Sequence, residues 1–304
     1  MRPARGATPL SGVLAIDKPT GLTSHDVIAT LRRATGERRI GHAGTLDPLA
    51  TGVLVVLIGP ATRLAQYLTG HDKSYEATVI FGATTDTLDS DGTVTGRAEV
   101  PETVLDADVA SQLLASMEGA TEQVPPVYSA IKTDGVIAHR AARAGAAPDL
   151  APRSVIIHEA RLLSIDTERD SWYVALHVSK GTYVRAFARD LGVAAGTLAH
   201  VAALRRVASG PVTISEAVSL DDAVDAASAG GLERYFLDPV RLLGMPVLEG
   251  AADAALTGRP VAADAHPGSS SSVVLADDAK LYAIYRREGD LYRAETVLPG
   301  GVCR

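Results

Sequence analysis

Residues 41–58 read GHAGTLDPLATGVLVVLI, a loop of small and polar residues that leads into an apolar run. The run, residues 53–58, contains only Val, Leu and Ile and predicts a strand buried on both faces. In the loop, Pro48 disfavours helical backbone at Asp47, and the glycines permit close backbone approach. We therefore expect an irregular loop that presents one carboxylate, Asp47, in front of a buried strand.

The elements around this stretch follow from periodicity and turn residues. Residues 12–17 predict a strand that a KPTG turn closes. Thr23 is a suitable N-cap for a helix with Asp26 in its first turn, and Gly36 is a suitable stop. The segment SKGTYVRAFARDLG indicates a strand end that continues as a helix. Further strands are predicted at residues 74–81, 155–165 and 172–178, and further helices at residues 104–117 and 197–206.

The alternation of strands and helices predicts an α+β fold with a mixed sheet. Residues 1–240 are expected to form the main domain. Residues 120–152 lack periodicity and are expected to be a mobile excursion from it. Alanine-rich residues 222–230 suit a surface helix or a linker, and residues 245–304 suit a small β-rich C-terminal domain.

Composition excludes several protein classes. The chain has 304 residues, an apolar fraction of 46% and a formal net charge of −7, which argues against a generic basic nucleic-acid binder. Local patches still decide such binding. Cys303 is the single cysteine, so no disulfide framework is expected. We find no signal-peptide pattern and no membrane-spanning run, and we expect a cytoplasmic protein.

Metal and calcium chemistry have weak support in the sequence. His42 with Asp47, or His71 with Asp72, could be ligands, but neither HExxH nor paired cysteines occur. The aspartates of the TDTLDSDG segment resemble a calcium loop that lacks its final glutamate. We interpret them as turn residues, one of which could form a structural salt bridge.

Other common chemistries lack their motifs as well. The chain has no GxxxxGK[ST], no well-placed GxGxxG and no GxSxG. A glycosidase needs two opposed carboxylates, and no second acid has a context as constrained as that of Asp47. A single-carboxylate nucleophile is the remaining interpretation.

A nucleophilic carboxylate needs a nearby cation to stay ionised. Arg185 is the candidate. In GTYVR, Tyr183 and Arg185 are two residues apart and would share one face of a strand. Tyr75, at the start of its predicted strand, could supply a second aromatic ring. Two rings, a guanidinium and a carboxylate suit a planar base.

The chain resembles the TruB family of bacterial tRNA pseudouridine-55 synthases over residues 11–210. The resemblance rests on segments that occur in family-like order and spacing: GVLAIDKPTGLTSHDVI, RIGHAGTLDPLATGVLVV, DKSYEATVIFG, TDTLDSDG, VPPVYSAIKTDG, SKGTYVRAFARDLG and HVAALRR. It implies the mixed-sheet pseudouridine synthase fold, with a C-terminal RNA-binding domain that is PUA-like. It also implies isomerisation of uridine 55 in the T-loop of tRNA after base flipping.

The resemblance also implies roles for individual residues. Asp47 matches the catalytic aspartate, and Arg185 matches the arginine paired with it. His42 matches the histidine that fills the place of the flipped uridine. Tyr75, Tyr183 and Leu204 match pocket residues. Of these, Tyr75 matches the tyrosine that stacks on the flipped uracil. Lys18 and Pro19 match a turn that supports the pocket.

Two positions differ from common family members. Ala43 stands where many relatives have threonine, and a crowded loop makes a small effect the expectation. His139 stands where tyrosine is common, in the segment that resembles an RNA-clamping thumb. We expect RNA to bind to a basic face of the protein, opposite an acidic surface formed by residues 99–122. The basic face is expected to contain Arg32, Arg33, Arg38, Arg39, Arg205 and Arg206.

The reaction is a redox-neutral isomerisation, so we expect no cofactor and no metal. We expect a monomer that binds the T-arm of tRNA without an obligate protein partner or a membrane. Two alternatives stay open. One is a non-catalytic tRNA-binding or tRNA-folding protein on the same fold, and the other is a glycoside hydrolase.

Overall fold

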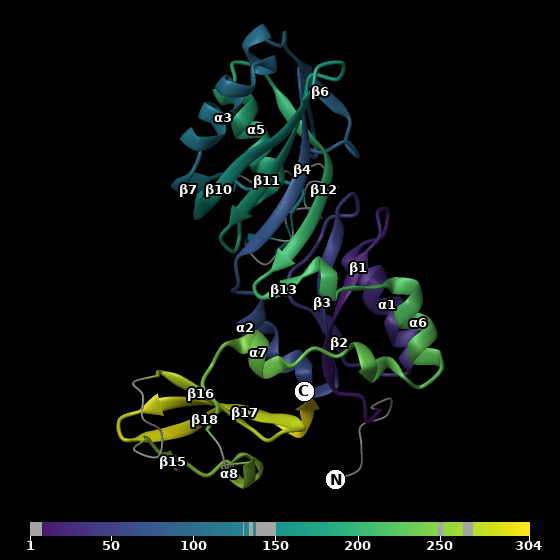
Figure 1. Ribbon diagram of the computed structural model, residues 1–304, viewed down its shortest axis with the longest axis vertical. Helices are drawn as coiled ribbons and strands as arrows, with labels where there is room; N and C mark the ends of the chain where they lie inside the picture. Colours follow the sequence, from purple (N-terminus) through teal and green to yellow (C-terminus); the bar gives the residue numbers. More distant parts are fainter. Residues whose placement is uncertain (1–7, 130, 134–135, 138–149, 249–251, 264–269) are drawn as a thin grey trace. The chain divides into compact units, whose positions relative to one another are not determined.

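The structure is a computed structural model that describes residues 8–129, 131–133, 136–137, 150–248, 252–263 and 270–304 (Figure 1). The chain forms two compact units. The first unit consists of residues 1–48, 52–71 and 208–304, and the second of residues 49–51 and 72–207. Within the described residues, no helix is long and apolar enough to cross a membrane.

The first unit is built on strands β1 (Gly12–Lys18) and β3 (Thr51–Ile58), which pair antiparallel from Gly12–Ile58 to Lys18–Gly52. The short strand β14 (Val218–Ser219) joins β1 in parallel, so the sheet is mixed. Other elements of this part of the unit are β2 (Ile40–His42), η1 (Gly59–Leu64), α2 (Ala65–Leu68), β13 (Val212–Thr213), η3 (Ile214–Glu216), η4 (Leu232–Tyr235) and α7 (Pro239–Leu243). Residues 53–58 are buried throughout, as a strand covered on both faces requires.

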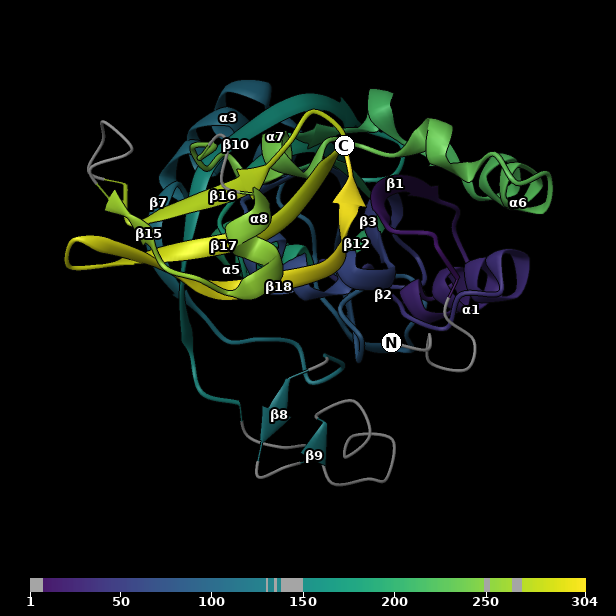
Figure 2. The ribbon, with the colours of Figure 1, turned by 90° about the horizontal axis from the view of Figure 1, so that it is seen from below.

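Helix α1 (Ser24–Thr35) confirms the expected capping signals. Thr23 and Asp26 form a reciprocal capping box, and the hydrogen bonds from Thr23 lower the pKa of Asp26. Gly36 ends the helix in the left-handed conformation, where glycine carries no Cβ penalty. Helix α6 (Leu220–Ser228) packs beside α1 (Figure 2), so the alanine-rich stretch is a docked helix rather than a linker.

The C-terminal strands form a separate four-stranded sheet in the order β15-β18-β17-β16. Its elements are β15 (Val261–Ala262), β16 (Ser272–Ala276), β17 (Lys280–Glu288) and β18 (Leu291–Cys303), accompanied by α8 (Ala252–Thr257). This confirms the β-rich C-terminal region. Side chains of β16–β18 share one hydrophobic core with those of β1 and β3, including Val274, Leu281 and Val302. A chain division between residues 240 and 245 stays a prediction.

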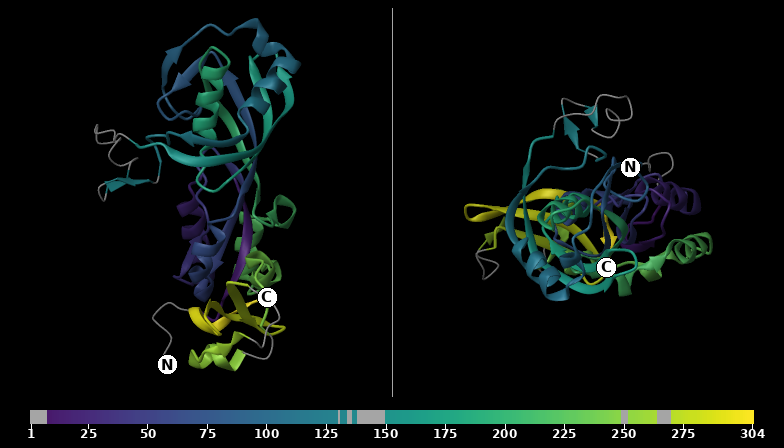
Figure 3. Two further views of the ribbon diagram at one scale, coloured as in Figure 1. Left: turned by 90° about the vertical axis from the view of Figure 1, so that its left-hand side faces the viewer. Right: turned by 90° about the horizontal axis from the view of Figure 1, so that it is seen from above.

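The second unit contains strands in the order β12-β4-β11-β10-β7. Its strands are β4 (Lys73–Phe81), β5 (Ala83–Thr85), β6 (Val94–Arg97), β7 (Gly119–Gln123), β8 (Lys132–Thr133), β9 (Val136–Ile137), β10 (Arg153–Asp166), β11 (Ser171–Val178) and β12 (Ala199–Ser209). Its helices are η2 (Glu102–Leu105), α3 (Ala107–Ser116) and α5 (Val184–Ala194). The left view of Figure 3 shows α5 beside the long strands.

One face of this sheet is buried and the other is not. Alternate residues of β4 are buried from Lys73 to Phe81, and the residues between them are partly exposed. Helix α5 contacts β4, and α3 contacts β10. On the buried face, the ring of Trp172 lies 4.7 Å from that of Phe81, and its Nε1 donates to the Val104 carbonyl. The opposite face of β4 is consequently partly exposed to solvent.

Three expectations about local structure are wrong. Residues 199–209 are strand β12 rather than a helix, and β12 lies next to β4 in the sheet. The segment 179–183 leaves the sheet before α5 begins, so Tyr183 is the N-cap and Arg185 lies in the helix. Residues 120–123 belong to β7, which pairs with β10, so this part of the expected excursion is sheet. His139 lies outside the described residues.

Candidate functional site

Asp47 lies in an irregular loop whose backbone is held on both sides. Ser24 Oγ donates to the Leu46 carbonyl at 3.1 Å and accepts from the Leu46 amide at 2.9 Å. The Gly21 amide donates to the Pro48 carbonyl at 2.9 Å. The residues before and after Asp47 are therefore fixed, while Asp47 itself keeps partial exposure. An anchored carboxylate with access to solvent suits chemistry on a bound molecule.

Lys18 connects the KP turn to this loop through hydrogen bonds. Its side chain is fully buried, and Nζ donates to the carbonyls of Pro19, Leu22 and Pro48 at 2.8, 2.7 and 3.3 Å. Three carbonyls satisfy the ammonium group, which would otherwise be costly to bury. The KP turn therefore supports the Asp47 loop, in agreement with the supporting role that the sequence implied.

His42 ends strand β2 on the N-terminal side of the same loop. Its ring is half-buried and meets that of His25 edge-on, with centroids 5.7 Å apart and planes at 85°. Ala43 is buried in the core of the first unit. A methyl group therefore fills this position, and the small effect expected there stays a prediction.

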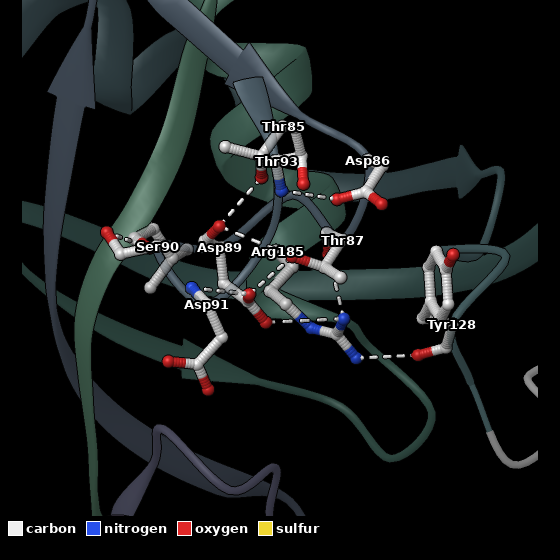
Figure 4. A network of polar contacts seen from close by, with 10 residues as sticks. Thr85, Asp86, Thr87, Asp89, Ser90, Asp91, Thr93, Tyr128 and Arg185 are labelled. Atoms are coloured by element: carbon white, nitrogen blue, oxygen red, sulfur yellow. Dashed lines mark hydrogen bonds and ion pairs between the residues drawn. The ribbon is translucent and has the colours of Figure 1, made fainter. Parts of the chain in front are cut away.

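Arg185 is held by a buried network in the second unit (Figure 4). Its Nη1 donates to the Thr87 carbonyl at 2.8 Å, and its Nη2 donates to the Tyr128 carbonyl at 2.9 Å. Nη1 also lies 3.5 Å from Asp89 Oδ2 in an ion pair. The guanidinium is thus oriented from the β5–β6 turn and from the loop that carries Tyr128.

Asp89 is the site residue that sequence reasoning placed only as a turn aspartate with a possible salt bridge. That salt bridge exists, and its partner is Arg185. Thr87 Oγ1 donates to Asp89 Oδ1 at 2.5 Å, and the Asp91 amide donates to the same oxygen at 3.2 Å. Leu88 adopts a φ of 63°, a rare conformation for a leucine, immediately before Asp89. The aspartates of the TDTLDSDG segment indicated a salt bridge, but only the fold identifies Arg185 as the cation that pairs with Asp89.

The expected pocket residues come from three elements of the second unit. Tyr75 is buried on β4, and Leu204 is buried on β12. Tyr183 is half-buried at the N-cap of α5, where it packs against Ile131 and Leu150. Its amide donates to Gln123 Oε1 at 2.8 Å. The one-face argument for Tyr183 and Arg185 is therefore wrong, because a strand periodicity does not apply to them.

The expected basic face needs one correction. Arg32, Arg33, Arg38 and Arg39 are exposed around α1 and the segment after it. Arg206, by contrast, is only 1% exposed and lies in the interior. Burial, and then the charge of Arg206, lower the pKa of Lys73 to about 8. Arg205 is half-buried and donates to Thr51 Oγ1 at 3.2 Å.

Comparison with known proteins gives a consistent result. Residues 32–184 match the family model of the TruB family pseudouridylate synthase N-terminal domain, and residues 185–241 match that of the tRNA pseudouridylate synthase B C-terminal domain. The tRNA pseudouridine synthase B of Syntrophotalea carbinolica is 45% identical over 70% of this chain and 68% of its own length. That of an Arthrobacter species is 40% identical over 90% of both chains.

Solved structures agree on the fold. A chain from the crystal structure of a Cbf5-Nop10-Gar1 complex superimposes with a TM-score of 0.71 at 24% identity, covering 98% of this chain and 91% of that one. This likeness supports the α+β mixed-sheet fold of pseudouridine synthases.

Proposed function

The chain belongs to the TruB family of pseudouridylate synthases and is a tRNA pseudouridine synthase, and we propose that its target is uridine 55 in the T-loop of tRNA, with Asp47 as the nucleophile. The observation that carries the proposal is the anchoring of the loop around Asp47. Leu46 and Pro48 are both held by hydrogen bonds, so the carboxylate between them has a defined position.

The reaction breaks the bond between N1 of uracil and C1′, rotates the base and forms a bond between carbon 5 and C1′. Carbon 5 loses a proton and N1 gains one, so the product is an isomer of the substrate. Asp47 attacks either the ribose or the uracil ring, and Arg185 supplies the positive charge that keeps Asp47 ionised. The preorganised Arg185 network supports this role, because a guanidinium fixed by Asp89, Thr87 and Tyr128 needs no reorientation during the reaction. The isomerisation transfers no electrons and needs no cofactor.

The target base must first leave its stack in the RNA loop. Flipping costs a few kcal/mol, and stacking on aromatic rings returns about 1–3 kcal/mol per base. We propose that Tyr75 stacks on the extruded uracil and that His42 occupies the place that the base leaves. Tyr183 and Leu204 line the pocket and exclude water, which would otherwise convert isomerisation into hydrolysis.

The deciding experiment is Asp47→Ala with pseudouridine mapping of a T-arm transcript. We expect pseudouridine at position 55 to fall to background while the affinity for tRNA changes less than threefold. Asp91→Ala, at an exposed aspartate of the second unit, is the control and should keep wild-type activity. Pseudouridine formed by Asp47→Ala would overturn the nucleophile assignment, and formation at another position would overturn the target.

The same assay separates the alternatives. A non-catalytic tRNA-binding protein would give no pseudouridine with the wild-type chain. A glycoside hydrolase would release free uracil, so the balance between released uracil and pseudouridine distinguishes it. We expect all converted uridine to be recovered as pseudouridine.

We further propose that tRNA binds through the exposed arginines near α1 and through the C-terminal sheet, as a monomeric protein. Each phosphate contact makes the logarithm of affinity fall with the logarithm of salt concentration by roughly 0.7–0.9. Replacing both Arg38 and Arg39 by glutamine should therefore reduce the magnitude of this slope by between one and two. An unchanged slope would remove these residues from the interface.

A further inference from the structure

Three side chains with metal-binding atoms meet on the polar face of the second unit's sheet. Asp72 precedes β4, His158 lies on β10 and His177 lies on β11. Their ligand atoms all lie within 4.8 Å of one another, and among the described residues they form the one such group of three or more. The side chains are 45%, 35% and 43% exposed, so an ion can reach them from solvent.

Strand pairing brings these residues together. His177 is directly opposite Ser74 on β4, two residues beyond Asp72. On the other side of β11, the register with β10 shifts between Ile157 and Glu159, so His158 is the additional residue of a bulge. The burial pattern of β10 changes phase at this point, with Ile157 buried, His158 and Glu159 exposed and Ala160 buried.

The pairing of Ile157 with Val178 brings His158 beside His177. Successive side chains of a strand alternate between its faces, and both histidines follow a buried neighbour, so both lie on the exposed face. The ring of His158 lies 4.9 Å from the ring of His177, with their planes at 52°. His158 Nε2 lies 3.2 Å from Asp72 Oδ2, and His177 Nε2 lies 3.9 Å from the same oxygen.

Ser74 orients the second imidazole. Its Oγ lies 3.0 Å from His177 Nδ1. When Nδ1 carries the proton, it donates to the serine oxygen, and Nε2 then presents its lone pair towards Asp72. A second hydrogen bond of this kind holds most metal-binding histidines in the correct tautomer.

We propose that Asp72, His158 and His177 bind a divalent transition-metal ion, with Zn²⁺ as the best-matched species. Ligand atoms around tetrahedral zinc are about 3.3 Å apart, since each bond is about 2.0–2.1 Å long. The 3.2 Å separation between His158 and Asp72 already meets this, and the 3.9 Å separation between His177 and Asp72 exceeds it by about 0.6 Å. The three ligand atoms lie within 4.8 Å of one another, so the two imidazoles must also move together around the ion. Two imidazoles select zinc-like ions over Mg²⁺ or Ca²⁺, which prefer oxygen ligands.

The site is separate from the proposed catalytic residues of this unit. Tyr75 follows Ser74 on β4 and is buried, whereas Ser74 and His177 lie on the opposite, partly exposed face. The ion would connect β10, β11 and the residue before β4 from that face. It would stabilise the sheet and leave at least one coordination position for water.

The test measures metal binding to the full-length protein by calorimetry with Zn²⁺ and by visible absorption with Co²⁺ as a spectroscopic substitute. We expect one ion per chain at this site, with intense d–d absorption typical of low-coordinate Co²⁺. His158→Ala, His177→Ala and Asp72→Asn should each weaken binding at least tenfold. Ser74→Ala should weaken it less, since it removes only an orienting bond.

His25→Ala is the matched control, because His25 is an exposed histidine in the first unit. It should bind Zn²⁺ like the wild type. Equal Zn²⁺ binding by wild type and a His158→Ala/His177→Ala double variant, or no binding by the wild type, would overturn the proposal. Thermal melting without metal establishes that each variant is folded.

Discussion

Arg185 Nη1 lies 3.5 Å from Asp89 Oδ2, and the two side chains are only 5% and 7% exposed. A helix and a turn nearly 100 residues apart in the chain thus share one buried ion pair, because Arg185 belongs to α5 and Asp89 to the segment between β5 and β6. The pair gives the acidic turn after β5 a structural role, because it fixes the orientation of the Arg185 guanidinium.

Removal of this carboxylate should be costly. Removal of one partner of a buried ion pair leaves the other charge poorly compensated, here that of Arg185. Asp89→Ala should therefore lower the free energy of unfolding by about 3 kcal/mol. Urea unfolding measures the change. Asp91→Ala, at an exposed position two residues away, should change it by less than about 0.5 kcal/mol. Equal stability of the two variants would refute the role of Asp89.

Lys18→Met should weaken both stability and catalysis. It removes the donor that Pro19, Leu22 and Pro48 share, and buried bonds to charged groups are worth about 1.5–3 kcal/mol. We expect an unfolding free energy lower by about 2–3 kcal/mol and a reduced kcat, because Pro48 adjoins Asp47. Lys180→Met, at an exposed lysine, is the control. A Lys18→Met protein with full kcat would show that the hydrogen bonds of Lys18 are not needed to position Asp47 for catalysis.

Lys73 should make stability depend on pH in the alkaline range. Its pKa is about 8 in the folded chain, against 10.5 for an unperturbed lysine, chiefly because of burial. Between these values the unfolded chain binds more protons, so the contribution of Lys73 to the unfolding free energy rises with pH. Below pH 8 both states are protonated and the cost of burial is complete.

Lys73→Met should therefore remove a rise of about 2–3 kcal/mol between pH 8 and pH 10.5. The comparison of urea unfolding for wild type and variant at several pH values isolates this term. Lys180→Met should keep most of the rise, because Lys180 makes only a small contribution to the Lys73 shift. A wild-type profile parallel to that of Lys73→Met would contradict the expectation.

Gly192 is required by a close approach in the second unit. A Cβ at this position of α5 would lie 2.5 Å from the Ala199 amide nitrogen and 2.9 Å from the Leu198 carbonyl carbon. Gly192→Ala should therefore destabilise the chain by about 1–3 kcal/mol despite the better helix propensity of alanine. Gly231→Ala meets only a side-chain atom at 3.9 Å and should be nearly neutral in the same thermal melts.

Local signals in the sequence predicted much of the fold. The capping box at Thr23, the left-handed stop at Gly36 and the buried strand over residues 53–58 depend on neighbours within a few positions. The alternation of apolar and polar residues predicted β4 and β11, because only one face of each strand is buried.

Prediction failed where one stretch of sequence is compatible with both a helix and a strand. Residues 197–206 contain apolar and basic residues at spacings compatible with a helix, but residues 199–209 form strand β12 next to β4. Tyr183 and Arg185 were assigned to a strand face, whereas the chain leaves the sheet after Val178 and starts α5 at Val184. Sheet pairing with a distant strand decided the first case, and the end of β11 before Tyr183 decided the second.

The sequence by itself determined the family, the loop that carries Asp47 and the residue types available for chemistry, because these depend on order and spacing along the chain. Tertiary structure alone decided that Asp89 pairs with Arg185, that Arg206 is buried and that Asp72 meets His158 and His177. The ion pair and the cluster each join residues far apart in sequence, and the burial of Arg206 depends on the sheet around it. Strand register and burial create them, and neither is encoded in any single segment.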